Sequence, residues 1–441
     1  TETYMQNTFP VSIQHLHNLR TFLLNNFRGR WCPTKHLSVI GRLKNLQILS
    51  LHESYIKELP QEIEELTSLR LLDLFECLSL EKIPGNVLSS LTALEELYIS
   101  SKFKVEKDLF SEIISLPHLI ALTARVNWAG GLPTVSFRKP LQQYTIYSRD
   151  LWHGKLQCSR NVSIDVLDGS KMASLQKLFP QVEHLHIGRL QDTLENLLPE
   201  CFENLTVLKI DACYLDCLIN TTIMSQPRPF YSNLQNLKLD WLWDKVTTIT
   251  RFYNSIHLPD SLQNIIYTTR TCQPTPLFSN LQHLTLLGTT RMTKLCKGPP
   301  PPGWLANLRK LQMQCMDNCL EVQNIVPHAI STGPKLERLE VWGYYRLEYI
   351  FGFEREDLQH IKSEMSLFPC PQEMDLGDLH DLKGIWKWPN QWSGRNKLRG
   401  KWRRHHQLET LHLTNNDNRD EFRDLILEAM LRSLNSLVTI T

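Results

Sequence analysis

One phrase, Leu-x-x-Leu-x-x-Leu-x-Leu, recurs along the chain and limits what the chain can fold into. It is most regular early, as LKNLQILSL at 43–51, LTSLRLLDL at 66–74 and LTALEELYI at 91–99. Later copies open with phenylalanine, as in FENLTVLKI at 202–210 and FSNLQHLTL at 278–286. Such self-similarity predicts stacked units, because one unit of this size cannot bury its own apolar face.

The residue that opens each Leu-x-Leu step marks one unit. Sixteen units follow, spaced by 18 to 37 residues and mostly by 22 to 29. Each step predicts a short strand, because alternate side chains of a strand point to opposite faces. The markers are Phe22, Leu49, Leu72, Leu97, Leu122, Tyr144, Val162, Leu185, Leu208, Leu237, Ile265, Leu284, Leu311, Leu339, Met374 and Leu411.

The residue between the two core positions tests this frame, since it should face solvent. In fourteen units it carries a polar group: Ser50, Asp73, Tyr98, Thr123, Thr145, Ser163, His186, Lys209, Lys238, Thr285, Gln312, Glu340, Asp375 and His412. The other two units have Leu23 and Ile266 there. A wrong register would place leucines among the fourteen, so the pattern favours a parallel sheet with one apolar and one polar face.

Composition excludes several classes. The 48 Lys and Arg nearly balance the 46 Asp and Glu, giving a formal net charge of +2, unlike a strongly basic nucleic-acid binder. No apolar run approaches the ~20 residues of a membrane helix. Residues 1–10 have no basic and apolar signal-peptide regions. We therefore expect the eleven cysteines to be free thiols in a reducing compartment.

The phrase is the signature of leucine-rich repeats. We expect an α/β repeat fold, a leucine-rich-repeat solenoid shaped as a curved horseshoe. Its parallel sheet should line the concave face, with irregular or short helical segments on the convex side and about 16 repeats. The expected layout is an N-terminal flank (1–15), the solenoid (16–418) and a C-terminal helical cap (419–441). Within the solenoid, repeats should be regular over 16–126 and irregular over 127–418.

Residues 44–100 resemble the repeat domain of plant nucleotide-binding leucine-rich-repeat (NLR) disease resistance proteins of the coiled-coil class. The resemblance rests on Ile56-Lys57-Glu58-Leu59-Pro60, Leu69-Arg70-Leu71-Leu72-Asp73-Leu74 and Cys77. FENLTVLKIDAC (202–213) and LGDLHDLKGIW (376–386) resemble the irregular C-terminal repeats of the same family. Gly-x-x-x-x-Gly-Lys-[Ser/Thr], the phosphate-binding loop of the family's nucleotide switch, is absent from the chain.

The resemblance implies a protein-recognition and autoinhibitory module of an intracellular plant immune receptor. Its partners would be a pathogen effector or guarded host protein, and its own upstream nucleotide-binding domain contacting repeats 16–100. ATP or ADP would bind only that absent domain, so this chain should need no cofactor. A cytoplasmic location is expected, with nuclear or peripheral membrane association left open, and no enzymatic activity. The alternative is a substrate receptor or adaptor of the F-box ubiquitin-ligase type, although residues 1–15 are too short for an F-box bundle.

Candidate binding residues are side chains expected on or beside the concave strands. Aromatic and basic groups on a rigid sheet are frequent anchors of protein interfaces, although packing against the next repeat would also explain the aromatic ones. The predicted set is Phe75, Tyr98, Arg125, Tyr147, Lys209, Lys238 and Trp342.

A second candidate is a basic, Trp-rich loop at 383–407. It fills the longest gap between markers and has no acidic residue. It could hold an acidic protein partner or be only a solvated loop, while nucleic acid is not expected from the nearly balanced charge. Its candidate contact residues are Lys397, Arg399, Lys401, Arg403 and Arg404.

Histidines and cysteines give weaker signals. His184 and His186 should face the same side of one strand, but no Cys or carboxylate partner is evident nearby in the sequence. Cys77 and Cys213 follow the second core position by three residues, where a small buried side chain is expected rather than a redox switch. No metal site is predicted.

Overall fold

The computed structural model describes residues 11–26, 37–99, 102–127, 135–148, 160–167, 174–175, 177–190, 202–211, 217–220, 231–240, 264–267, 278–288, 292, 295–297, 305–315, 336–350, 351–352, 372–382, 384–387, 410–414 and 439–440. The chain divides into two compact units. Unit 1 comprises residues 1–165 and 170–184, and unit 2 comprises 166–169 and 185–441. Each unit is a leucine-rich-repeat solenoid built on a parallel sheet.

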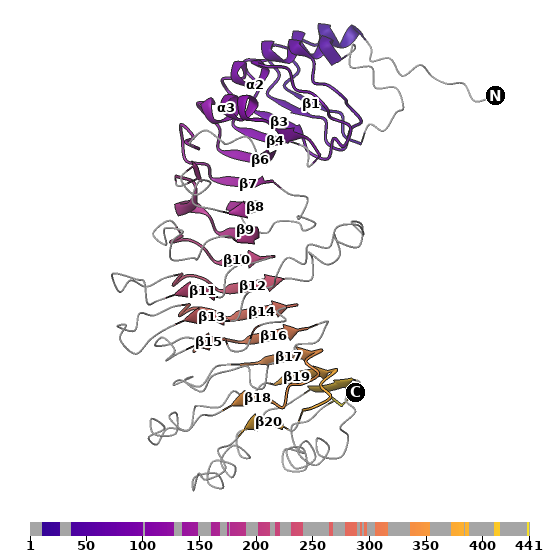
Figure 1. The fold of residues 1–441 in the computed structure, drawn as a ribbon. Helices are drawn as coiled ribbons and strands as arrows, with labels where there is room; N and C mark the ends of the chain where they lie inside the picture. Colours follow the sequence, from indigo (N-terminus) through magenta and orange to yellow (C-terminus); the bar gives the residue numbers. More distant parts are fainter. Residues whose placement is uncertain are drawn as a thin grey trace, which may run out of the picture. The chain divides into compact units, whose positions relative to one another are not determined.

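The sheet of unit 1 adds strands in chain order, all parallel (Figure 1). Between β4 and β7, the short β5 and the long β6 pair side by side. The strands are β1 (Thr21–Leu23), β2 (Ile48–Ser50), β3 (Leu71–Leu74), β4 (Glu96–Ile99), β5 (Lys104–Val105), β6 (Ala121–Val126), β7 (Gln143–Tyr147) and β8 (Arg160–Leu167).

The predicted register holds through most of unit 1. The markers Phe22, Leu49, Leu72, Leu97, Leu122 and Tyr144 are successive partners across the sheet. At β8 the register moves by two residues, because Tyr144 pairs with Arg160 and Ile146 pairs with Val162. A shift of two keeps the face of each side chain, so Val162 is still buried.

Short helices return the chain from one strand of unit 1 to the next. They are η1 (Val11–His15), η2 (Ser38–Arg42), η3 (Gln61–Glu65), α2 (Val87–Ser90), α3 (Lys107–Ser115) and η4 (Phe179–Gln181). From η1 to α3 each helix packs on its neighbour. A side chain at Gly41 would place Cβ 2.3 Å from the carbonyl oxygen of Glu62, so the approach of η2 to η3 requires glycine.

The leucines of the repeat phrase fill the space between these helices and the sheet. In the 43–51 copy, Leu43, Leu46, Leu49 and Leu51 are all buried, and the copy at 66–74 repeats the arrangement. Ile63 of η3 is buried with them. Stability is therefore a sum over neighbouring repeats.

The principal sheet of unit 2 is also parallel and follows chain order. Its strands are β9 (His184–Leu190), β10 (Val207–Ile210), β12 (Asn236–Asp240), β14 (His283–Leu287), β16 (Lys310–Gln314), β17 (Arg338–Trp342), β19 (Glu373–Gly377), β21 (Thr410–Thr414) and β22 (Thr439–Ile440). The markers from Leu208 to Leu411 pair in the predicted register, with the exception of Ile265.

Ile265 lies in a second layer of unit 2. It belongs to β13 (Asn264–Tyr267), which pairs with β11 (Cys217–Asn220) and β15 (Cys296–Lys297). The expectation that Ile265 opens a repeat of the principal sheet is therefore wrong, because β12 pairs directly with β14. A further pair, β18 (Tyr349–Gly352) with β20 (Gly384–Lys387), follows in later repeats.

Within each unit, asparagine side-chain amides hydrogen-bond to the backbone of the preceding repeat, and we call these bonds the asparagine ladder. Each donates to the carbonyl of a residue one repeat earlier: Asn45 to His17, Asn233 to Glu203, Asn280 to Ser232 and Asn307 to Ser279, at 2.6–2.8 Å. The carbonyl belongs to the residue before the equivalent asparagine of that repeat. These bonds satisfy backbone acceptors just before each strand, where the sheet has not yet begun.

The expected segments at the chain ends and in the basic loop are described only in part. Residues 11–15 of the N-terminal flank form η1. In the predicted basic loop 383–407, residues 384–387 form β20, so this stretch is a strand and not a loop. In the predicted helical cap 419–441, residues 439–440 form β22 and pair with β21. The other residues of the loop and the cap lie outside the described residues.

Candidate functional site

The candidate surface is the polar face of each sheet, made of the residues between the two core positions. Three of the fourteen predicted solvent-facing side chains are buried, namely Ser50, Ser163 and His186, and the rest are partly or fully exposed. The buried Ser50 hydroxyl lies 2.7 Å from Asn25 Oδ1 and 3.1 Å from Asp73 Oδ2, so its single proton has two acceptors in reach. The face therefore covers some of its own polar groups.

In unit 1, Phe75 lies directly after β3 and Tyr98 lies on the neighbouring strand β4. Both side chains are partly exposed. The Phe75 ring stacks on His52 with centroids 5.8 Å apart, and its backbone N–H donates to Asp73. The Tyr98 hydroxyl donates to Glu96 at 2.8 Å. Partial burial, followed by the bond to Glu96, raises the pKa of Tyr98 far above its usual value. Phe75 is thus held against the preceding repeat, and Tyr98 is held by its own strand.

Arg125 and Tyr147 are register partners on β6 and β7. The Arg125 guanidinium is partly exposed and donates to the Ser148 carbonyl at 3.5 Å. Tyr147 is only 3% exposed. The expectation of an exposed aromatic anchor at Tyr147 is therefore wrong, because neighbouring groups of the fold cover its ring.

In unit 2, Lys209 and Lys238 are partners on β10 and β12. Each ammonium forms an ion pair on its own strand, with Asp211 at 2.9 Å and with Asp240 at 3.0 Å. These lysines therefore balance buried carboxylates within the sheet rather than presenting unbalanced positive charge to a partner.

Asp211 also pairs with His186, whose Nε2 lies 2.8 Å from Asp211 Oδ2, and both side chains are buried. Burial acts to raise the pKa of Asp211, but the hydrogen bond and charge of His186, together with Lys209, outweigh it and leave the pKa below its ordinary value. The carboxylate partner of His186 was not found from the sequence. It lies one repeat later, 25 residues along the chain.

Trp342 ends β17 and is partly exposed. A Cβ at Gly377, its partner on β19, would lie 2.4 Å from Cε3 of the indole, so the ring lies directly over that glycine. Partial burial and Glu340 raise the pKa of Asp375, whereas His412, the indole and Arg338 oppose that rise. Trp342 is thus fixed in orientation before any partner arrives.

Charged side chains lie on the same face of the sheet as Trp342, on its own strand and the two beside it. Lys310 pairs with Glu340 at 2.7 Å, and Arg338 lies 3.9 Å from Glu340 and pairs closely with Glu373. An amphipathic ring within a rim of polar and charged groups is typical of an interaction anchor.

The remaining sequence candidates divide between described and undescribed residues. Lys397, Arg399, Lys401, Arg403 and Arg404 lie outside the described residues, as does Cys213. Cys77, Cys217 and Cys296 are thiols and not half-cystines, and Cys77 is fully buried. Cys315 is disulfide-bonded, which corrects the expectation of free thiols at this position, because the fold brings its sulfur within bonding distance of another.

The described part of the chain lacks two kinds of feature, a metal-binding cluster and a membrane-spanning helix. Within the described ranges, no three His, Cys, Asp or Glu side chains lie close enough to hold a metal ion. Among the described helices, none combines the length and apolar character needed to cross a bilayer.

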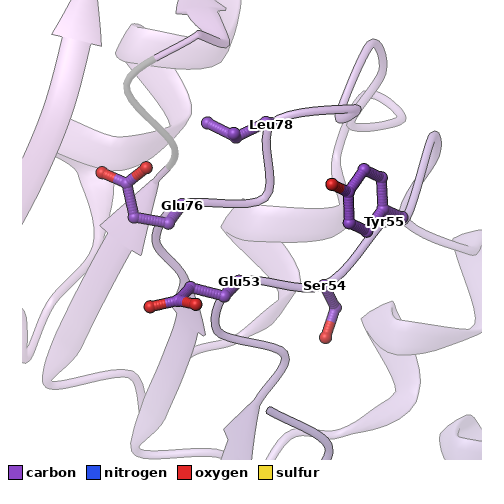
Figure 2. Close-up of a pocket in the computed structure, with 5 residues that line it drawn as sticks. All are labelled: Glu53, Ser54, Tyr55, Glu76 and Leu78. Carbon is purple, nitrogen blue, oxygen red and sulfur yellow. The ribbon is translucent and has the colours of Figure 1, made fainter. Parts of the chain in front are cut away.

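Sequence reasoning missed a pocket at the ends of β2 and β3. Its lining residues are Glu53, Ser54, Tyr55, Glu76 and Leu78 (Figure 2). The available signal was a repeated ending, HESY at 52–55 and FECL at 75–78, directly after two strands.

Comparisons with known proteins give one partial sequence match and structure alignments of low similarity. No family model matches the chain. A disease resistance protein of Arabidopsis thaliana is 39% identical over 84 residues, which is 19% of this chain and 8% of that protein. The matched segment therefore spans less than a tenth of that relative.

Two solved structures of leucine-rich-repeat proteins align with the chain at low similarity. A leucine-rich-repeat protein of Leptospira interrogans aligns over 98% of this chain and 92% of its own, with 14% identity and a TM-score of 0.37. The leucine-rich-repeat ectodomain of the Arabidopsis thaliana membrane receptor kinase GASSHO1/SCHENGEN3, solved in complex with CASPARIAN STRIP INTEGRITY FACTOR 2, aligns over 92% of this chain and 63% of its own, with 15% identity and a TM-score of 0.25.

Proposed function

We propose that this chain is a protein-recognition repeat domain without enzymatic activity, and that the polar face of unit 2 around Trp342 binds the partner. The observation that carries the proposal is the indole of Trp342, which lies over Gly377 of the neighbouring strand. A large ring that is already ordered loses little conformational freedom on binding. An open sheet face of paired charges also suits binding better than a reaction that must exclude water.

The finer proposal is an intracellular plant immune receptor. The repeat domain would sense a pathogen effector or its host target and would hold an upstream nucleotide-binding domain inactive until then. Support comes from the NLR-like wording of residues 44–100 and from the 39% identity to a plant disease resistance protein over 84 residues. Recognition would shift the receptor between resting and active populations.

A site-specific crosslinking experiment tests the binding face. A photo-crosslinking amino acid replaces Gln314, the register partner of Trp342, or the exposed Glu62 of η3 as the matched control. We expect a discrete partner adduct from position 314 in challenged tissue, lost in Trp342→Ala, and none from position 62. Equal adducts from both positions, or adducts unaffected by Trp342→Ala, would reject the proposed face.

A second measurement tests the receptor context. The native product from source tissue is mapped by mass and tryptic peptides. A mass far above 51.5 kDa, with upstream peptides that contain a phosphate-binding loop, supports an ATP-switched receptor. A native mass near that of this chain would contradict it and favour a stand-alone adaptor.

The location is tested through Cys315. Disulfides persist mainly in oxidising compartments, so a cytoplasmic protein should have this thiol reduced in the cell. Rapid alkylation of intact tissue, followed by peptide mapping, should find Cys315 alkylated if the protein is cytoplasmic. A Cys315 that is protected until reductant is added would place the protein in an oxidising compartment.

A further inference from the structure

The first four strands of unit 1 present a continuous sheet face on the side opposite the leucine core. β1 to β4 pair side by side in chain order (Figure 1). Along each strand, the side chains of this face alternate with those that point into the core. We call the following eight positions the N-terminal face: Thr21, Leu23, Ile48, Ser50, Leu71, Asp73, Glu96 and Tyr98.

Part of the N-terminal face is apolar and in contact with solvent. Leu23 is 60% exposed, more than any other large hydrophobic side chain of the described residues. Ile48 and Leu71 are partly exposed and are register partners on β2 and β3, so they occupy adjacent positions. Leu23 pairs with Ser50 and is therefore a diagonal neighbour of Ile48. Three aliphatic side chains thus gather on three successive strands.

The fold does not require apolar residues at these positions. Fourteen of the sixteen units have a polar group at the position of Leu23. The positions of unit 2 that are equivalent to Ile48 and Leu71 are occupied by Asn236, His283, Lys310, Arg338 and Glu373. Packing within the sheet therefore does not explain the aliphatic residues of the N-terminal face, whereas contact with a partner does.

Both charged side chains of the N-terminal face are acidic. Asp73 and Glu96 lie on β3 and β4, next to the aliphatic group. Partial burial raises the pKa of the Tyr98 hydroxyl, and the bond to Glu96 and the charges of Glu96 and Asp73 raise it further. The basic side chain of Arg70, one residue before β3, is paired with Glu95 at 2.7 Å. The face therefore combines aliphatic side chains with negative charge.

The two carboxylates are held in place before a partner arrives. Asp73 Oδ1 accepts the Phe75 backbone N–H at 2.9 Å, and Asp73 Oδ2 lies 3.6 Å from Nδ1 of His52. Glu96 accepts the Tyr98 hydroxyl at 2.8 Å. Because these groups are already ordered, they lose little conformational freedom when they pair with a partner.

We propose that the N-terminal face binds a segment of a protein partner in which apolar side chains are interspersed with lysine or arginine. The apolar side chains of the partner would pack on Leu23, Ile48 and Leu71 and remove them from water. Its basic groups would pair with Asp73 and Glu96, and the same negative charge would disfavour an acidic partner. This surface is separate from the polar face of unit 2 and does not depend on the function proposed for that face.

The test is a fluorescence anisotropy titration of the full chain with three labelled peptides of equal length. The first peptide contains leucine, arginine and serine, the second has glutamate in place of arginine, and the third has serine in place of leucine.

Two variants change the N-terminal face, and each has a matched control outside it. The double substitution Asp73→Asn with Glu96→Gln is matched by Glu62→Gln with Glu203→Gln, two exposed glutamates. Leu23→Ser is matched by Leu78→Ser, since Leu78 is 43% exposed and follows β3. Trp342→Ala reports binding at the polar face of unit 2.

We expect the leucine–arginine peptide to bind, the glutamate peptide not to bind, and the serine peptide to bind about tenfold more weakly. Each variant of the N-terminal face should weaken binding about tenfold, while both matched controls and Trp342→Ala bind like the parent chain. No binding of the leucine–arginine peptide, equal binding of the glutamate peptide, or equal weakening in a face variant and its control would overturn the proposal. Loss of binding in Trp342→Ala alone would also overturn it, because the peptide would then bind unit 2. Circular dichroism and melting of every variant separate lost binding from lost folding.

Discussion

The two units cover the apolar face of their principal sheets with different kinds of connecting segment. In unit 1 each strand is followed by a short helix, and η2, η3, α2 and α3 pack on one another behind the sheet. In unit 2 the corresponding segments include short parallel strands, β11, β13 and β15, then β18 and β20. Both arrangements cover the apolar face of a parallel sheet, which is the requirement that the leucines impose.

The difference follows from local composition. The helical return in unit 1 contains Pro60-Gln61-Glu62-Ile63, with proline just before the first helical residue and one apolar side chain facing inward. The β13 return contains Asn264-Ile265-Ile266-Tyr267, where adjacent β-branched residues favour a strand. Ile265 and Ile266 are both buried, as expected for a strand covered on both faces. The segment that connects one strand of the principal sheet to the next can therefore be a helix or a strand, provided that this segment covers the apolar core.

The largest expected effect breaks the second sheet of unit 2. Ile266→Asn removes a buried side chain and places an amide where no face of the strand is polar. We expect a loss of about 4 kcal/mol from the free energy of unfolding, measured by urea titration. Thr285→Asn, on the polar face of β14, should change it by less than about 0.5 kcal/mol. Equal effects would mean that β13 does not have two buried faces.

The next prediction compares an aspartate on the polar face of unit 2 with an aspartate on the polar face of unit 1. Asp211→Asn in unit 2 removes the buried carboxylate that His186 and Lys209 contact and should cost about 3 kcal/mol at pH 7. Asp73→Asn in unit 1 loses a more exposed contact with His52, 3.6 Å away, and should cost no more than about 1 kcal/mol. Urea unfolding of both variants at one pH gives the comparison.

The pH dependence of the Asp211 effect has a definite sign. The folded pKa of Asp211 is lowered, so its stabilisation is present above the unfolded pKa of about 4 and is lost as pH falls through the folded value. The difference between the parent chain and Asp211→Asn should therefore shrink as pH is lowered below about 4. A difference that stays constant down to pH 2 would exclude this carboxylate as its source.

A smaller effect tests helix stacking in unit 1. Gly41→Ala places Cβ 2.3 Å from a backbone oxygen of η3, and the two helices must separate. We expect a cost of about 2 kcal/mol. Gly85→Ala is the matched control in the same unit, because nothing lies within 4 Å of its Cβ position. Thermal melting gives the melting temperature of each variant. Equal melting temperatures for the two alanine variants would contradict the stacking argument.

The smallest effect concerns the feature that both units share. Asn45→Ala in unit 1 and Asn280→Ala in unit 2 each remove one hydrogen bond of the asparagine ladder and should each cost about 1 kcal/mol. Gln235→Ala, an exposed amide with no ladder role, should be nearly neutral. A clear difference between the two asparagine variants would show that the ladder matters to only one unit.

Much of the fold could be predicted from the sequence, but much less of the candidate site could be. Fifteen of the sixteen marker residues lie in the principal sheets, because the phrase repeats a physical requirement at each unit. The exception, Ile265, fits the apolar half of the phrase but lacks a polar residue after it. Of the predicted anchors, Trp342 is fixed on the polar face, Tyr147 is buried, and the two lysines are paired with aspartates two residues along their strands.

The sequence alone determined the repeat, the strand register over most of each unit and the polarity of the two sheet faces. Those properties depend on residue type at a short, fixed spacing, which the chain shows directly. Only the tertiary structure decided which residues meet across repeats, such as His186 with Asp211 and Trp342 with Gly377. Those contacts depend on loop length and backbone conformation between units, and neither follows from residue spacing.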